Sequence, residues 1–372
     1  GIRDVAVTGV QTCALPILAR FAERGSDVLA RLLAAPDLRD TDYERVRQLR
    51  LDRLRQLRDV PGAVAERVYL RQLYGAHPYG HLAVGDEPGL RASSLDDVRR
   101  CYAATFSPAR TQLIVVGAFS HDRLFRIVED AFGGWHASTA VVPGGPAAEA
   151  EAPPSGRGPR IVLVPRPGAA QSELRIGQLT TRRMTPDYMP LVVMNAILGG
   201  QFVSRINLRL REEKAFTYGA RTGFDWRRGV SPLGMQASVH TAATAEAVSD
   251  TLTEFADLRG SRPPSEAEMT SAKAALTAGF PRNFESAGQV ARSLAQLALY
   301  GLPDTYFEEF VPRIRAVTAD DVTRVAQAHI DPGAMTVVVV GDRDAVERPL
   351  GGLGVGDPVV LSPAGEPSGP ID

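Results

Sequence analysis

The residues best suited to chemistry in this chain are Arg211 and Tyr218, which stand seven positions apart. An arginine presents a planar fork of N–H donors and a tyrosine presents a phenol, and together they can polarise a peptide carbonyl or hold an oxyanion. The pattern around them predicts a helix that ends shortly before a strand. Taken alone it also fits a surface helix that ends in a turn, so its meaning depends on the surrounding sequence.

The elements that must position this pair follow from local sequence signals. A helix entered through Thr185-Pro186 stops at Gly199. Apolar residues that alternate along 233–239 predict a strand there. Ser265 with Glu268 forms a predicted capping box at the start of a helix. The predicted elements are helices over 187–198, 244–258 and 265–279, with strands over 161–164, 215–224 and 233–239.

The chain contains an internal repeat. Residues 94–117 align without a gap on residues 318–341. Each copy begins with a predicted helix cap, continues through an x-Pro turn and ends in a short apolar strand, Leu113–Val116 in the first copy and Thr336–Val340 in the second. Self-similarity of this kind indicates two similar halves.

Both halves are expected to be α+β, each an antiparallel-rich sheet covered by helices. A segment rich in proline, glycine and alanine at 143–159 predicts a linker between them. Residues 1–17 resemble, codon by codon outside a short index, a translated sequencing adapter, so we leave them out of the fold and treat Cys13 as non-native. We therefore expect a first half over 18–142 that is truncated at its N-terminus, a second half over 160–355 and a tail over 356–372.

Composition limits the function. A formal net charge of -1 gives no electrostatic basis for binding nucleic acid. Cys101 is the single native cysteine, which excludes an intramolecular disulfide framework and a cysteine-based zinc site. We find no apolar run long enough to predict a membrane span. The compartment stays open between bacterial cytoplasm and periplasm.

The surroundings of Arg211 and Tyr218 resemble the insulinase/pitrilysin family of inverted zinc metallopeptidases over roughly residues 18–355. That family has an L-G-G…S-R-L…L-R-E-x-x-x-x-x-Y run in its second half, matched here at Gly199, Gly200, Ser204, Arg205, Arg211, Glu212 and Tyr218. The resemblance implies a clamshell of two homologous halves. It also implies that the arginine and tyrosine bind an extended peptide at a zinc site.

The zinc site itself is not expected in this chain. The family binds zinc through H-x-x-E-H on a helix and a further Glu, and no H-x-x-E-H occurs here. The alignment anchored on Asp59 and Pro61 places Arg53 at the position of the third ligand, and a guanidinium has no lone pair for a metal. A local misalignment is the alternative. His77 and His81 flank a Pro-Tyr-Gly turn, so we predict no metal role for them.

Some members of the family work as pairs in which one chain carries H-x-x-E-H and the other supplies the arginine and tyrosine. Our leading hypothesis is a non-catalytic subunit of this kind, inactive alone and without bound metal, acting with a zinc-bearing partner. The first alternative is a fragment of a self-sufficient zinc metalloendopeptidase whose H-x-x-E-H lies upstream of residue 18. The second is a structural subunit without a proteolytic role.

Overall fold

The structure is a computed structural model, and it describes residues 17–136 and 160–367. The contacts within the chain divide it into two compact units. Unit 1 contains residues 1–55, 83–148 and 281–304, and unit 2 contains residues 56–82, 149–280 and 305–372. The predicted linker at 143–159 lies outside the described residues, and the division into halves on either side of it stays a prediction.

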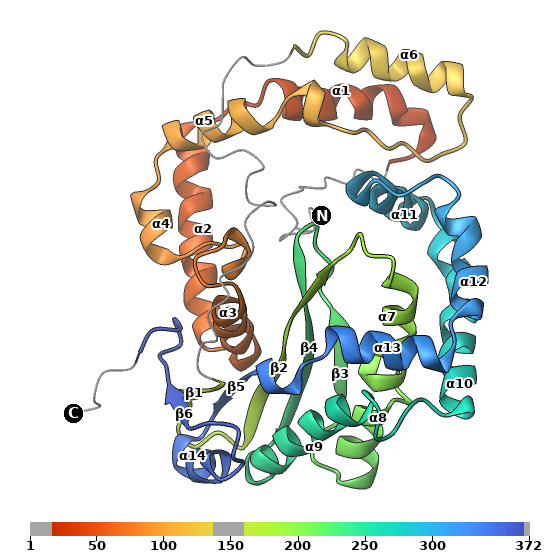
Figure 1. The fold of residues 1–372 in the computed structure, drawn as a ribbon. Coiled ribbons are helices and arrows are strands. Elements are labelled where there is room, and N and C mark those ends of the chain that lie inside the picture. The colour runs from red at the N-terminus through yellow and green to blue at the C-terminus, as the bar shows by residue number, and fades with distance from the viewer. Residues whose placement is uncertain (1–16, 137–159, 368–372) are drawn as a thin grey trace. The chain divides into compact units, whose positions relative to one another are not determined.

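Unit 2 is built on a six-stranded mixed sheet in the order β3-β4-β2-β5-β1-β6 (Figure 1). Strands β3, β4, β2 and β5 pair in an antiparallel manner, whereas β1 lies parallel to β5 and to β6. The α+β class predicted from the sequence is confirmed. The strands are β1 (Ile161–Pro165), β2 (Gln171–Arg182), β3 (Ala220–Phe224), β4 (Val230–His240), β5 (Thr336–Gly341) and β6 (Pro358–Val360).

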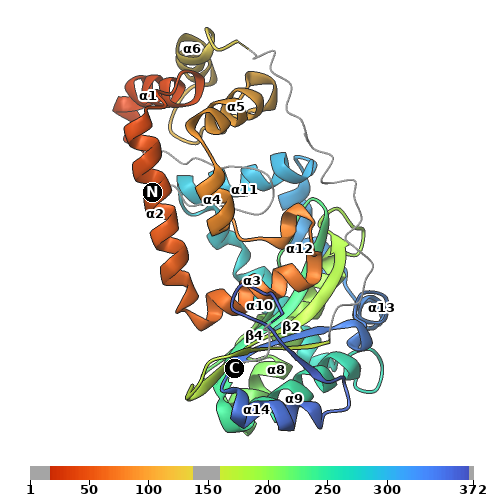
Figure 2. The same ribbon diagram turned by 90° about the vertical axis from the view of Figure 1, so that its left-hand side faces the viewer.

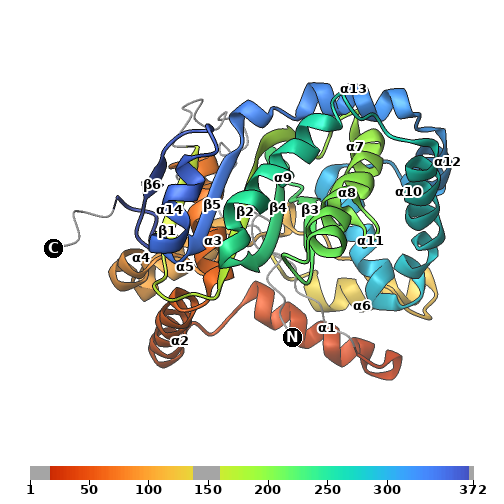
Figure 3. The same ribbon diagram turned by 90° about the horizontal axis from the view of Figure 1, so that it is seen from below.

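Helices cover both faces of this sheet (Figures 2 and 3). Helix α3 (Pro61–Tyr74) packs on one face against β2 and β5, where Val64 and Val68 join a core with Val162 and Val338. Helices α9 (Thr244–Asp257) and α14 (Arg343–Gly351) lie on the other face. Because both faces are covered, β1 and β5 are runs of buried apolar residues, Ile161–Val164 and Val337–Val340.

A pair of glycines brings α3 close to the sheet. Gly177 and Gly234 stand opposite each other on β2 and β4, and a Cβ on either would lie within 3 Å of the Tyr69 hydroxyl. Tyr69 uses this space to donate a hydrogen bond of 3.3 Å to the carbonyl of Leu233. Burial raises the pKa of the Tyr69 phenol, so the hydroxyl stays protonated and remains a donor.

The remaining helices of unit 2 surround β3 and the far end of the sheet (Figure 1). They are α7 (Tyr188–Asn195), α8 (Arg205–Asn207), α10 (Glu266–Ala278), α12 (Tyr306–Ala316) and α13 (Ala319–His329). One helical stretch of the described residues, Tyr188–Glu213, is long and apolar enough by composition to span a membrane, with a mean hydropathy of 1.3. In its most apolar 18 residues, 61% are buried inside the protein, and bends interrupt the stretch at residues 201–204. We therefore interpret this stretch as helices of the protein core.

Unit 1 is helical in its described residues and has a thin core. Its helices are α1 (Ala22–Ala34), α2 (Asp40–Arg58, which ends in unit 2), α4 (Glu87–Ala92), α5 (Leu95–Thr105), α6 (His121–Phe132) and α11 (Ala287–Tyr300). Helix α1 packs against α6, and the Tyr102 hydroxyl of α5 donates to the carbonyl of Leu33 at the end of α1. Large apolar side chains such as Leu32 and Phe125 stay mostly exposed.

The internal repeat is visible in the helices. Helix α5 and helix α13 begin and end at equivalent positions, and each is closed by the predicted capping box, Ser94 with Asp97 and Thr318 with Asp321. The hydrogen bonds of a capping box join residues that are three apart in the sequence. They therefore form whenever the first turn of the helix forms.

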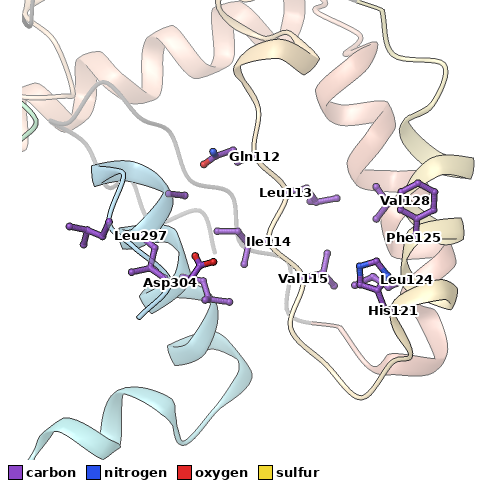
Figure 4. A pocket seen from close by; sticks show the side chains of 13 residues that line it. Gln112, Leu113, Ile114, Val115, His121, Leu124, Phe125, Val128, Leu297 and Asp304 are labelled. Atoms are coloured by element: carbon purple, nitrogen blue, oxygen red, sulfur yellow. The ribbon is translucent and has the colours of Figure 1, made fainter. Parts of the chain in front are cut away.

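The strand predicted over Leu113–Val116 is wrong. Its repeat equivalent, β5, is a strand because β2 and β1 flank it and accept its hydrogen bonds. Among the described residues no strand pairs with 113–116, and Leu113 and Val115 are about 40% exposed. They line a pocket of about 680 Å³ with Leu124 and Leu297 (Figure 4).

Most other predicted elements are confirmed within a few residues. The exception is the strand over 215–224, which begins only at Ala220. Residues 215–219 instead form the end of a helical turn and a bend, and this irregular segment carries Tyr218.

Candidate functional site

The segment that carries the family-like motif begins with a wide turn at two glycines. Residues Ala196–Gly200 continue α7 as a π-helical turn, a feature that is frequent at functional sites. A Cβ on Gly199 would lie 2.6 Å from the Thr222 hydroxyl oxygen on β3, so only glycine fits there. The chain then bends, and the Ser204 hydroxyl donates to the carbonyl of Gln201 at 2.6 Å.

Arg205 in this motif holds the fold together. Its side chain is 4% exposed, and its guanidinium donates twice to the carboxylate of Glu268, at 2.6 and 2.9 Å. It also donates to the carbonyls of Arg262 and Pro263. Partial burial acts to raise the pKa of Glu268, but the hydrogen bonds from Arg205 and the backbone of Ser265 outweigh it and lower the pKa to about 2. Arg205 therefore has no donor directed at a substrate.

Arg211 lies on a second π-helical turn, Leu208–Glu213, which is tied to α9. The ammonium of Lys214 lies 3.1 Å from the carboxylate of Asp250 and also pairs with Glu246, and both acids are on α9. The hydrogen bond to Glu246 is the main reason that the pKa of Lys214 is raised. Arg209 approaches the same Asp250 carboxylate at 3.4 Å. These contacts fix the turn without using Arg211.

The turn ends in a left-handed residue. Ala215 has a φ of 53° and is the single non-glycine residue with positive φ among those described. Its N–H donates to the carbonyl of Arg211 at 3.1 Å, and the N–H of Phe216 donates to Leu210 at 2.8 Å, which closes the helix end. This reversal explains why β3 starts later than predicted.

Tyr218 stands at the tip of the bend between two anchored residues. The buried Thr217 hydroxyl bonds to the backbone of Gly219, and the N–H of Ala220 donates to the side chain of Asn207 at 2.9 Å. Tyr218 itself is 89% exposed. The backbone is thus held in place while the phenol stays open to solvent.

The guanidinium of Arg211 packs against the aromatic ring of Phe202. Its central carbon lies 4.3 Å from the ring centroid of Phe202, a cation–π distance. Its Nη1 lies 3.4 Å from a Glu212 carboxylate oxygen, and this buried nitrogen makes no hydrogen bond. Since a buried donor without a partner costs free energy, an acceptor from outside would relieve that cost.

Phe202 was missed by sequence reasoning. It is 66% exposed, and its neighbour Val203 is 65% exposed. An apolar pair, Phe202-Val203, inside the family-like motif could have indicated a functional surface. No rule of sequence spacing, however, predicts that Phe202 contacts Arg211, nine residues later. The contact depends on the bend between the two π-helical turns.

The residues considered as metal ligands are separate in the structure. Arg53 is exposed on α2, and the adjacent Asp52 carboxylate accepts hydrogen bonds from Gln48 and Arg55. His77 accepts from the N–H of Tyr79 within the Pro-Tyr-Gly turn, as expected of a turn residue. Across residues 17–136 and 160–367, no three His, Cys, Asp or Glu side chains gather in a way that would hold a metal ion. The role of Arg53 stays a prediction.

Comparison with known proteins identifies relatives of the chain. Residues 93–276 match the family described as peptidase M16 inactive domain. An uncharacterized zinc protease of Mycobacterium tuberculosis is 26% identical over 294 residues, which cover 77% of this chain and 64% of the relative. The chain therefore spans less than two thirds of the length of that curated relative.

Solved structures share the fold. A peptidase M16 inactive domain from Pseudomonas fluorescens superposes with a TM-score of 0.77 at 21% identity, covering 87% of this chain and 76% of that one. A protease from Helicobacter pylori superposes with a TM-score of 0.78 at 18% identity, covering 87% and 78%. At these identities the likeness shows the fold alone.

Proposed function

The chain belongs to the insulinase/pitrilysin (peptidase M16) family, and we propose that it is a non-catalytic subunit that binds an extended peptide at a partner chain's zinc site. In this role Arg211 donates to a backbone carbonyl of the peptide, and Tyr218 adds a phenol at the same region. The partner carries H-x-x-E-H, binds the zinc ion and supplies the metal-bound chemistry.

One observation carries the proposal. Among the motif residues, Arg211 keeps an Nη1 nitrogen that makes no hydrogen bond and lies 3.4 Å from its neighbour Glu212, and Tyr218 is 89% exposed. Arg205, by contrast, donates hydrogen bonds to the carboxylate of Glu268 and to two backbone carbonyls. A purely structural role accounts for Arg205 and leaves Arg211 and Tyr218 without a purpose.

The chemistry expected of the pair is electrostatic. Donors fixed before the reaction stabilise the negative charge that develops on a peptide carbonyl oxygen, and removing one such donor typically costs about 3–4 kcal/mol in the transition state. The Arg211 guanidinium is suited to this because Phe202 supports its plane and the ion pairs of Lys214 fix the turn that carries it. Neither support is a hydrogen bond to the Arg211 Nη1 nitrogen.

A second candidate has its own support. The relatives are named zinc proteases, and this chain matches 64% of their length. In a self-sufficient zinc protease, Arg211 and Tyr218 would do the same work on a zinc site in their own polypeptide. The two candidates differ in where the zinc ligands are encoded.

Reconstitution separates the candidates. The chain is purified alone, the H-x-x-E-H chain of the same genome is purified alone, and the two are mixed; zinc content and cleavage of a quenched fluorescent peptide are measured for each. The proposal expects zinc only in the H-x-x-E-H chain and cleavage only in the mixture. Cleavage by the H-x-x-E-H chain alone at the rate of the mixture contradicts the subunit role. Stoichiometric zinc and cleavage by a longer polypeptide that joins an upstream H-x-x-E-H to this chain, without the second chain, support the second candidate.

A further inference from the structure

We propose that Asn207 is a positioning residue of the candidate site, because its side chain ties together the segments that carry Phe202, Arg211 and Tyr218. This inference rests on the proposed function and names the residue that aligns the two side chains expected to bind the peptide. Asn207 is the last residue of α8 and is 3% exposed. It therefore acts through its neighbours and not by touching a peptide.

The carboxamide of Asn207 bonds to two different segments. Its Nδ2 donates to the carbonyl of Phe202 at 2.7 Å, and its Oδ1 accepts from the N–H of Ala220 at 2.9 Å. A carbonyl needs a donor and an N–H needs an acceptor, so these two partners fix the orientation of the carboxamide. A carboxylate of the same shape offers acceptors only, so this position requires the amide.

The first of these bonds holds the segment that supports Arg211. Phe202 is 66% exposed, so packing in the core does not fix its ring. Side chains instead hold the backbone of this segment: the Ser204 hydroxyl donates to the carbonyl of Gln201 at 2.6 Å, and Asn207 donates to the next carbonyl. The ring that lies 4.3 Å from the Arg211 guanidinium thus takes its place from these backbone contacts.

The second bond holds the base of the bend that presents Tyr218. Tyr218 is 89% exposed, so its place is set by the backbone and not by packing. Ala220, two residues later, is the first residue of β3 and pairs with Ala237 on β4. The bond from its N–H to Asn207 therefore fixes the point at which the bend joins the sheet.

The third connection is the helical stretch itself. Asn207 precedes Arg211 by four residues, at the junction of α8 with the π-helical turn Leu208–Glu213. One buried side chain thus joins the three segments of the site. Donors stabilise a developing charge only when they are aimed at the same atom, and a misplacement of about 1 Å can cost about a hundredfold in rate. Losing one end of the carboxamide should therefore misalign Arg211 and Tyr218 while both remain present.

The test is Asn207→Asp in this chain, with kcat and KM for peptide cleavage measured in the complex with the H-x-x-E-H chain. Aspartate keeps an acceptor for the N–H of Ala220 but places a second acceptor against the carbonyl of Phe202. We expect kcat/KM to fall about tenfold or more, mainly through kcat, because the aligned donors act in the transition state.

A second variant covers the case in which Asn207→Asp does not fold. Phe202→Leu removes the ring at an exposed position, where the fold does not depend on it. It should lower kcat/KM about two- to fivefold, the effect of losing one cation–π contact with Arg211. Wild-type kcat/KM in Phe202→Leu overturns the inference.

A background that carries Arg211→Ala and Tyr218→Phe separates positioning from a merely structural role. A positioning residue acts through these two side chains, so adding Asn207→Asp should change the residual kcat/KM by less than about twofold. A structural defect lowers the amount of folded protein, and kcat/KM then falls by the same factor in both backgrounds. That second result overturns the inference.

The matched control is Asn195→Asp, the same substitution at another asparagine that bonds to β3. Its side-chain oxygen accepts a hydrogen bond of 2.8 Å from Thr222, and aspartate keeps that acceptor. The control should leave kcat/KM near wild type. If Arg211→Ala and Tyr218→Phe lower kcat/KM and Asn207→Asp does not, this inference alone fails. If neither Arg211→Ala nor Tyr218→Phe has an effect, the proposed function fails and this inference falls with it.

Discussion

Replacing Arg205 with alanine tests whether this arginine is structural. The substitution leaves the carboxylate of Glu268 without its counter-charge and removes the donors from the carbonyls of Arg262 and Pro263. Breaking a fully buried ion pair costs about 3–5 kcal/mol. Because the Glu268 side chain is 32% exposed and water reaches it, we expect a loss of about 2–3 kcal/mol in the free energy of unfolding.

The Arg205–Glu268 ion pair should make the free energy of unfolding depend on pH. Folding lowers the pKa of Glu268 from 4.5 to about 2, so its contribution is complete above pH about 4.5 and is lost as the pH falls through about 2. A shift of this size corresponds to about 3.4 kcal/mol without screening, and solvent screening reduces the expected contribution to about 1–2 kcal/mol. Glu268→Gln removes this titration while keeping an acceptor for the helix cap.

The assay is urea unfolding followed by Trp226 fluorescence in the Trp135→Phe background, so that the signal reports on unit 2. Arg209→Ala is the control, because Arg209 is an arginine of the same motif with its own acidic partners and a more exposed side chain, and its loss should destabilise the chain clearly less than the loss of Arg205. Equal, small losses in Arg205→Ala and Arg209→Ala refute the reasoning. So does a difference between wild type and Glu268→Gln that stays constant from pH 7 to pH 3.

Two further predictions concern the backbone around the site. Ala215→Gly should stabilise the chain by up to about 1 kcal/mol, because a left-handed conformation costs an alanine roughly 1–2 kcal/mol and part of the gain is offset by the freedom of glycine when unfolded; a lower melting temperature would argue against strain at this position. Gly199→Ala should destabilise by about 2 kcal/mol or more, because its Cβ would meet Thr222 at 2.6 Å. Gly223→Ala, which meets open space, should change the melting temperature little, and similar losses in both glycine variants would contradict the assigned packing.

Local chemistry made the helix ends predictable. The capping boxes at Ser94, Ser265 and Thr318 join residues three apart, and all three formed as the sequence indicated. The second role of Glu268 was not accessible in this way, because Arg205 stands 63 residues earlier and reaches it only through the packing of α10. Sequence patterns specify such a contact only when the fold is already known.

Strands depend on partners that the local sequence does not contain. Residues 113–116 and 337–340 have similar apolar patterns, yet only the latter lie between two strands that accept their hydrogen bonds. The start of β3 was misplaced for a different reason. A left-handed residue at Ala215 ends the preceding turn, and an alanine gives no sequence signal for that conformation.

The central claim is that Arg211 and Tyr218 act on a peptide bound at a zinc site. The most direct measurement is kcat/KM for peptide cleavage by the zinc-containing complex with Arg211→Ala, Tyr218→Phe or Arg209→Ala in this chain. We expect the Arg211 variant to lose about a hundredfold or more and the Tyr218 variant to fall clearly, with zinc content unchanged and the Arg209 variant near wild type. Wild-type kcat/KM in both the Arg211 and Tyr218 variants would contradict the proposed function.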